Sequence, residues 1–234
     1  SAFEQINGPG HSVTFTDISD VIAEFIAFEW RADDSPFDQY LRTGEPLPKA
    51  ANLGMSLFYG KAQCSTCHAG QFQTDHDFHA IALPQVGPGK SARFETHARD
   101  EGRLRVTGNP ADAYKFRTPS LRNIAQTAPY GHNGAYATLE AMIRHHLDPV
   151  ASLKAYNVAQ LVLPDLPNSQ DFRATHDSDE QAAIAAANEL SPSNLSEMEI
   201  IQIVAFLNAL SDTASLAGKL GVPQTVPSGL SVDQ

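Results

Sequence analysis

The sequence predicts an all-α protein. Several stretches carry apolar residues at the i, i+3, i+4 spacing of an amphipathic helix, and residues that can cap a helix precede most of them. Convincing strand patterns are not found. The 234 residues are 42% hydrophobic and 18% charged, which suits one medium-sized domain that can bury a real core.

The first half of the chain is predicted to hold two helices. Thr16 can cap the first, and Pro36 ends that region. The apolar residues of this helix recur at helical spacing: Ile18, Val21, Ile22, Phe25 and Ile26. Pro48 suits the first turn of a second helix, which runs toward Cys64.

Three more helices are expected in the second half. Thr138 can cap a short helix over residues 139–147, which Pro149 stops. An alanine-rich helix is plausible over residues 179–190. Ser196 and Glu199 form a capping box ahead of a strongly amphipathic helix that extends to Leu210.

Both cysteines of the chain lie in Cys64-Ser65-Thr66-Cys67-His68, the C-x-x-C-H pattern of covalent haem attachment. Each thiol can add to one vinyl group of the same porphyrin, and His68 then lies under the iron as the proximal ligand. A redox disulfide or half of a zinc site are the alternatives. A zinc site needs two more soft ligands at short spacing, and the sequence has no second C-x-x-C. The sequence therefore predicts one haem c.

A long irregular segment, residues 70–118, follows the motif and is expected to wrap the haem. Half of the 16 basic residues lie within residues 90–123: Lys90, Arg93, Arg99, Arg103, Arg105, Lys115, Arg117 and Arg122. They could bind the haem propionates or form a solvated basic loop. Apolar neighbours favour Arg117 and Arg122 as buried, and we expect one of them to bond a propionate or a buried carbonyl.

A helix leading into C-x-x-C-H, a long wrapping loop and a closing C-terminal helix are the layout of a class I cytochrome c, here enlarged by long loops. Residues 17–212 are expected to form this domain. Residues 1–16 would be an N-terminal extension, and residues 213–234 a tail over the surface.

The iron has a sixth position to fill. At 100° per residue, Met142 and His146 share the apolar face of the helix over residues 139–147, whereas His145 points about 100° away. An unpaired imidazole on an apolar face is costly, and a metal bond or a carbonyl partner would resolve that cost. His146 is the leading candidate, and Met142 and His132 are the next. The weaker candidates are Met55, Met198, His76, His79, His97, His145 and His176.

Charge and hydropathy limit the partners. The net charge of −11 predicts a poor general binder of nucleic acid, because phosphate contacts need a basic face. No run approaches the ~20 apolar residues of a membrane-spanning helix. Ser1 opens a polar segment without the features of a signal peptide. Since haem c is attached outside the cytoplasm, we expect a removed signal and a periplasmic protein.

Several motifs resemble the C-terminal haem domain of bacterial di-haem cytochrome c peroxidases and their methylamine-utilisation relatives. They occur in order over about residues 17–211: Ser35–Asp38, Phe116–Ile124, Thr127–Gly134, Ala137–Glu140 and Ile203–Leu210. In that family the distal ligand lies eight positions after the Thr of Thr-Leu-Glu, which implies His146. The resemblance also implies a calcium site that uses the backbone oxygens of Thr127 and Pro129 with an Asn of the other domain.

Family members carry two C-x-x-C-H motifs, whereas this sequence carries one. The resemblance therefore favours an electron-transfer haem domain over an independent peroxidase. Its partners would be a small cytochrome c or cupredoxin and a second haem domain or subunit. A self-sufficient peroxidase reducing hydrogen peroxide is the alternative, with His132, Glu140 and His145 as candidate acid/base groups.

Overall fold

The computed structural model describes residues 8–87, 99–161, 172–226 and 228–232, and helices dominate it. The helices are α2 (Phe15–Glu29), α3 (Pro36–Thr43), α4 (Lys49–Tyr59), α5 (Leu104–Thr107), α6 (Leu139–Leu147), α7 (Pro149–Lys154), α8 (Ser178–Ala187), α9 (Glu197–Asn208) and α10 (Thr213–Ala217). Two short strands, β1 (Phe78–His79) and β2 (Phe116–Arg117), pair antiparallel. The all-α fold class is confirmed.

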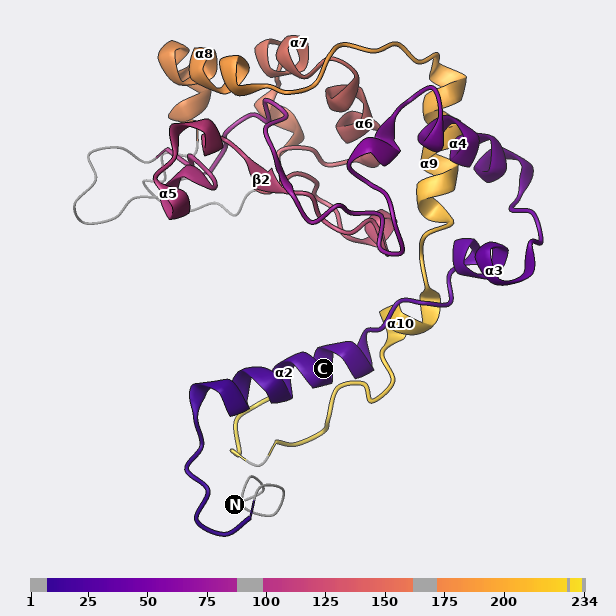
Figure 1. Ribbon diagram of the computed structural model, residues 1–234, viewed down its shortest axis with the longest axis vertical. Helices are drawn as coiled ribbons and strands as arrows, with labels where there is room; N and C mark the ends of the chain where they lie inside the picture. Colours follow the sequence, from indigo (N-terminus) through magenta and orange to yellow (C-terminus); the bar gives the residue numbers. More distant parts are fainter. Residues whose placement is uncertain (1–7, 88–98, 162–171, 227, 233–234) are drawn as a thin grey trace.

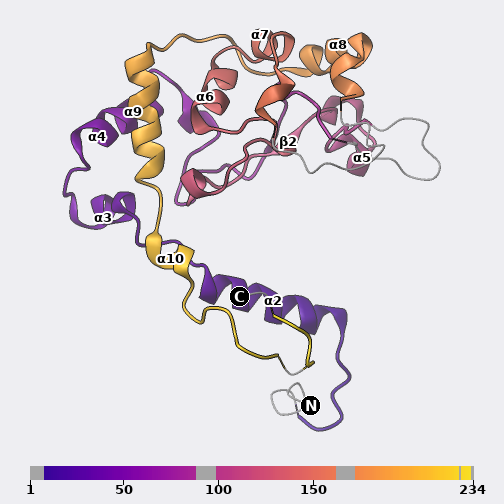
Figure 2. The same cartoon turned by 180° about the vertical axis from the view of Figure 1, so that it is seen from behind.

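The elements form a main body and an arm (Figure 1). In the body, α4 packs on α9 at one side, and α6, α7 and α8 lie toward the other. The arm consists of α2 and the C-terminal tail, which run beside each other away from the body. The same separation is visible from behind (Figure 2).

The core of the body is the crossing of α4 and α9. The predicted capping box is present at Ser196, and α9 buries Ile203 and Phe206 completely or nearly so. Gly54 makes the close approach of the two helices possible, because a Cβ at this position would lie 1.8 Å from the carbonyl oxygen of Gln202. The packing of α4 on α9 in turn fixes the direction in which the chain enters the C-x-x-C-H turn.

The prediction for the start of the first helix was wrong. Thr14, rather than Thr16, caps α2, because Asp17 bonds back to the backbone and hydroxyl of Thr14 and completes a capping box. Pro36 and Pro149 begin α3 and α7 rather than only ending the preceding segments. Proline suits the first turn, where its missing N–H leaves no bond unmade.

Other expected elements are close to those observed. Thr138 caps α6 through the N–H of Ala141, and α6 has the predicted bounds. The alanine-rich helix, α8 (Ser178–Ala187), begins one residue earlier and ends three residues earlier than the predicted range of 179–190. The described helices include none long and apolar enough to cross a membrane. Of the residues singled out by sequence, Lys90, Arg93 and His97 lie outside the described ranges.

Candidate haem site

The C-x-x-C-H residues form one tight turn after α4. The backbone N–H groups of Cys67 and His68 both donate to the carbonyl of Cys64, at 3.4 and 2.9 Å. Burial raises the pKa of Cys64 to about 11 and also raises that of Cys67. A redox-active C-x-x-C needs a thiol whose pKa is lowered, so this environment disfavours the redox-disulfide alternative.

The structure brings His68 and His146 together from opposite parts of the chain. Their ring centroids lie 6.5 Å apart, and the ring planes are inclined at 59°. A metal held between two imidazole nitrogens, with bonds of about 2 Å each, separates the ring centroids by roughly 6 Å. The pair could therefore hold one metal ion between them.

Both rings are fixed in the tautomer that a metal requires. The Nδ1 of His68 bonds the carbonyl of Gln73 at 3.2 Å, and the Nδ1 of His146 bonds the carbonyl of Met142 at 2.9 Å. A carbonyl only accepts, so each Nδ1 carries the hydrogen and each Nε2 has a lone pair available. Burial lowers the pKa of His68 to about 4, helped by the neighbouring His146, and burial also lowers the pKa of His146. Both imidazoles are therefore neutral near pH 7.

His145 differs from its neighbour, because both of its nitrogens are used inside the protein. It is fully buried, its Nε2 bonds the carbonyl of Ile81 at 2.7 Å, and its Nδ1 lies 2.9 Å from the hydroxyl of Tyr136. The same hydroxyl contacts Ser152 Oγ at 2.8 Å. Burial lowers the pKa of His145 to about 3. These bonds fix the rotation of α6 and leave His145 poorly suited to acid/base chemistry.

The runner-up ligands have other contacts. Met142 packs against the cluster that contains Leu83 and Tyr136, which is a core role. His132 is exposed and stacks on the ring of Phe116, with centroids 3.5 Å apart. Neither contact places these side chains beside His68 in the way that His146 is placed.

Arg122 is buried, as expected, and it connects α3 to the haem-motif turn. Its guanidinium forms a close ion pair with Asp38 and donates from Nε and Nη2 to the carbonyl of Gln71, at 3.2 and 2.6 Å. Burial tends to raise the pKa of Asp38, but the bonds from Arg122 and Ser35 hold it below its usual value. Gln71 lies three residues after His68, so this buried pair supports the loop that follows His68.

Arg117 is exposed, so its expected burial was wrong. Successive side chains of a strand point to opposite sides, and here Phe116 takes the inner side of β2. The guanidinium of Arg117 bonds the carbonyl of the adjacent Thr118 at 3.0 Å. Arg117 thus bonds the carbonyl of a buried residue, Thr118, whereas Arg122 bonds the carbonyl of the exposed Gln71. A bond from either arginine to a haem propionate stays a prediction.

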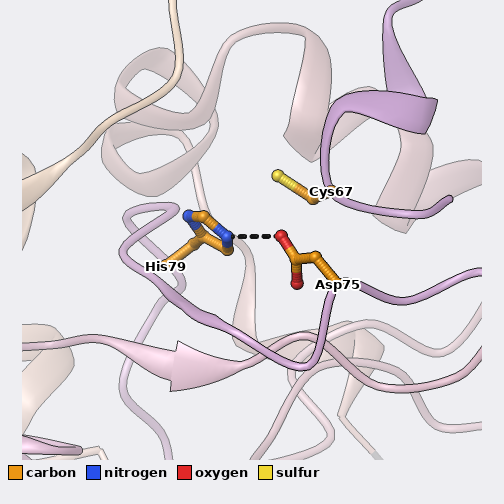
Figure 3. Close-up of side chains that lie close together, drawn as sticks. All are labelled: Cys67, Asp75 and His79. Atoms are coloured by element: carbon orange, nitrogen blue, oxygen red, sulfur yellow. Dashed lines mark hydrogen bonds and ion pairs between the residues drawn. The ribbon is translucent and has the colours of Figure 1, made fainter.

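A polar cluster lies beside the second cysteine. The Sγ of Cys67 and one ligand atom each of Asp75 and His79 lie within 4.8 Å of one another (Figure 3). His79 bonds Asp75 at 2.9 Å and lies 3.4 Å from Glu189. With a single thiol, which the motif assigns to porphyrin attachment, this cluster does not have the donor set of a structural zinc site.

The residues implied for calcium, Thr127 and Pro129, lie in an exposed stretch between β2 and α6. Sequence reasoning missed three features of the site: the carbonyl of Gln73, the carboxylate of Asp38 and the Tyr136 hydroxyl. Asp38 had a local signal, because Ser35 and Asp38 have capping-box spacing. No comparable signal marks the other two: the Gln73 carbonyl meets His68 through the shape of the loop between them, and the Tyr136 hydroxyl meets His145 across the start of α6.

No family model matches the sequence, but individual proteins do. The chain is 31% identical over 201 residues to the cytochrome-c peroxidase IdrP1 of Denitromonas iodatirespirans, covering 77% of this chain and 46% of that protein. It spans less than half the length of the curated relatives it matches.

Solved structures agree. A MauG-like protein associated with microbial copper homeostasis superposes with a TM-score of 0.61 at 27% identity, covering 90% of this chain and 61% of that one. The diheme peroxidase BthA of Burkholderia thailandensis shares the fold, with a TM-score of 0.55 at 20% identity, covering 79% of this chain and 48% of BthA. A helical fold with a C-x-x-C-H turn is the architecture of c-type haem proteins. Within that class, the chain belongs to the family of bacterial di-haem cytochrome c peroxidases and MauG-like proteins.

Proposed function

We propose that this chain is a one-haem electron-transfer domain. Cys64 and Cys67 would attach one haem c, and His68 and His146 would hold its iron. The domain would exchange electrons with a second redox centre. The observation that carries the proposal is the pairing of His68 and His146, 6.5 Å apart, with an Nε2 available on each ring.

The protein residues hold and orient the group. The turn after α4 presents both thiols and His68, and the carbonyls of Gln73 and Met142 fix the two imidazoles. Low pKa values keep both rings unprotonated at neutral pH. When bound, haem c supplies a one-electron couple at its iron. Two axial imidazoles give a lower reduction potential than a histidine and a methionine would.

A self-sufficient peroxidase is the alternative, and the peroxidase names of the relatives favour it. Such an enzyme needs an iron position that peroxide can reach and an acid/base group nearby. The bonds of His145 to Ile81 and Tyr136 occupy that residue, and Glu140 and His132 are exposed. A site closed by His146 is better suited to electron transfer.

The same proposal predicts the redox partners of the domain and the compartment in which it acts. Its electron donors or acceptors are a small cytochrome c or cupredoxin and a second haem domain, and it acts in the periplasm, where haem c is attached. The acidic net charge of −11 does not suit a nucleic-acid partner. A calcium ion could bind the backbone oxygens of Thr127 and Pro129 only if the second domain supplies further oxygens.

Two measurements test this function. After acid–acetone extraction, a pyridine haemochrome assay should find one haem per chain still attached, and haem that washes out would refute attachment through Cys64 and Cys67. The purified haem-loaded chain should consume hydrogen peroxide slowly. Rapid peroxide turnover by a high-spin protein would favour the peroxidase instead.

A further inference from the structure

His145 is a fully buried histidine that directly precedes the proposed ligand His146. The Nε2 of His145 lies 2.7 Å from the carbonyl oxygen of Ile81. A carbonyl can only accept, so this nitrogen carries the hydrogen of the ring. The Nδ1 of His145 is therefore an acceptor, and the hydroxyl of Tyr136 donates to it at 2.9 Å.

Burial keeps both partners of this hydrogen bond neutral. It lowers the pKa of His145 to about 3, so the imidazole carries no positive charge near pH 7. Burial also raises the pKa of Tyr136, so the phenol keeps its hydrogen. The bond therefore runs from the phenol oxygen to the imidazole nitrogen throughout the neutral pH range.

The hydroxyl of Tyr136 joins three segments of the chain. It bonds His145 in α6, and its oxygen also lies 2.8 Å from the hydroxyl of Ser152 in α7. His145 in turn bonds Ile81 in the loop after β1. The ring of Tyr136 is 3% exposed and meets the ring of Tyr156 edge-on, with centroids 5.6 Å apart. This packing fixes the hydroxyl, and the hydroxyl fixes His145 relative to α7 and the loop.

His146 lies at the end of α6, where contacts from outside the helix are needed. It is the next-to-last residue of this helix. Carbonyl groups in the last turn of a helix have no partner within the helix, so this end is held from outside. The N–H of Ser193 donates to the carbonyl of Leu147 at 2.8 Å. The side chain of His145 supplies the two further bonds described above.

The hydrogen bond of the His146 ring does not tie it to the rest of the protein. Its Nδ1 bonds the carbonyl of Met142, one turn earlier in the same helix, so this bond moves with α6. The placement of His146 opposite His68, with the ring planes inclined at 59°, therefore depends on how the end of α6 is fixed. The rings of His145 and His146 lie 6.1 Å apart between centroids, so a displacement of one residue reaches the other.

We propose that Tyr136 is a positioning residue for the sixth ligand: through its bond to His145, its hydroxyl holds His146 on the iron and sets the plane of the His146 ring. This inference rests on the proposed function, in which His68 and His146 share one iron. Loss of the hydroxyl leaves a buried nitrogen of His145 without its donor. The end of α6 then shifts toward another partner, and His146 leaves the iron more often.

Displacement of His146 by cyanide tests this role in the haem-loaded chain. Tyr136→Phe keeps the ring and removes only the hydroxyl. The matched control is Tyr130→Phe, because Tyr130 is 7% exposed and belongs to the same apolar cluster as Tyr136. Both nitrogens of His145 are bonded to other groups, so the Tyr130 hydroxyl does not act on it. Stopped-flow absorption measures the rate at cyanide concentrations where it no longer rises, so that it reports the release of His146.

The limiting rate should rise at least about tenfold in Tyr136→Phe, the order expected when a group that orients a metal ligand is lost. It should rise less than about twofold in Tyr130→Phe. His145→Leu should also raise the rate, and adding Tyr136→Phe to it should change the rate less than about twofold, because the hydroxyl acts through His145. Equal rates in Tyr136→Phe and the unmodified protein, equal increases in the two Phe variants, or a full further increase in the His145→Leu background would overturn the proposal.

A spectroscopic readout separates positioning from a general loss of stability. The largest g-value of a low-spin ferric haem responds to the angle between the planes of its two axial imidazoles. It should shift in Tyr136→Phe and stay unchanged in Tyr130→Phe, even where both variants unfold at a lower temperature. An unshifted g-value in Tyr136→Phe would overturn the proposal.

The unmodified protein distinguishes a failure of this inference from a failure of the proposed function. If it is low-spin and His146→Ala makes it high-spin, the ligand assignment stands, and only the role of Tyr136 depends on the two Phe variants. If the unmodified protein is high-spin, or if His146→Ala leaves its spectrum unchanged, His146 is not the ligand and both fail together.

Discussion

The Nδ1 atoms of His68 and His146 both bond backbone carbonyls, and the two rings lie 6.5 Å apart between centroids. One ring comes from the turn after α4 and the other from α6, 78 positions later in the chain. Each carbonyl fixes one tautomer and leaves the Nε2 of that ring without a hydrogen. This relationship underlies the assignment of both residues as iron ligands.

Replacing His146 with methionine should raise the reduction potential of the haem. A methionine ligand favours the ferrous state relative to a second imidazole. A potentiometric titration followed at the visible absorption bands measures the change. Met142→Leu is the control, because Met142 packs in the core and is expected to leave the potential unchanged. A shifted potential in Met142→Leu with none in His146→Met would make Met142 the ligand.

Arg122→Met should destabilise the folded chain by about 3–5 kcal/mol. The side chains of Arg122 and Asp38 are 8% and 9% exposed, so removal of the guanidinium leaves a buried carboxylate without its partner. Chemical denaturation of the haem-loaded protein measures the loss. Arg117→Met is the matched control, because Arg117 is exposed and should change stability little. Equal effects of the two substitutions would contradict the role given to the buried pair.

The same carboxylate should make stability depend on pH in the acid range. The folded pKa of Asp38 is lowered, so its contribution is complete above the unfolded pKa of about 3.9 and disappears as the pH falls through the folded value. In Asp38→Asn, this part of the acid dependence should be missing. Denaturation midpoints measured between about pH 2 and pH 6 give the comparison. Identical pH profiles for both proteins would mean that Asp38 does not titrate with folding.

Gly54→Ala should destabilise the crossing of α4 and α9 by about 1–3 kcal/mol or more. The added Cβ would lie 1.8 Å from the backbone oxygen of Gln202, so one helix must shift. Thermal unfolding of the variant measures the effect. Gly44→Ala is the contrast, because a Cβ at Gly44 meets nothing within 4 Å. The φ of Gly44 is +76°, so any loss of stability in this variant comes from backbone strain alone. An unchanged melting temperature in Gly54→Ala would refute the close helix contact.

Local patterns predicted much of this structure. Capping residues and apolar spacing located α6 and α9. The C-x-x-C-H motif predicts His68 as the proximal ligand, and this stays a prediction. Helical geometry separated His146 from His145, which the structure places in different environments. Thr14 caps α2 in place of the predicted Thr16, because the side chain of Asp17 completes a capping box with Thr14. Apolar neighbours in the sequence predict a buried Arg117, but successive side chains of β2 point to opposite sides, and Arg117 lies on the exposed one. The pairing of Asp38 with Arg122 joins segments 84 positions apart, and the Gln73 carbonyl meets His68 through the shape of a loop; spacing encodes neither contact.

The ferric absorption and electron paramagnetic resonance spectra of the haem-loaded chain test the central claim most directly. If His68 and His146 are both ligands, the protein is six-coordinate and low-spin. His146→Ala should then become high-spin, consume peroxide faster, and return to the low-spin spectrum when imidazole is added. A high-spin spectrum of the original protein, or a low-spin spectrum that His146→Ala leaves unchanged, would contradict the assignment of His146 as the sixth ligand.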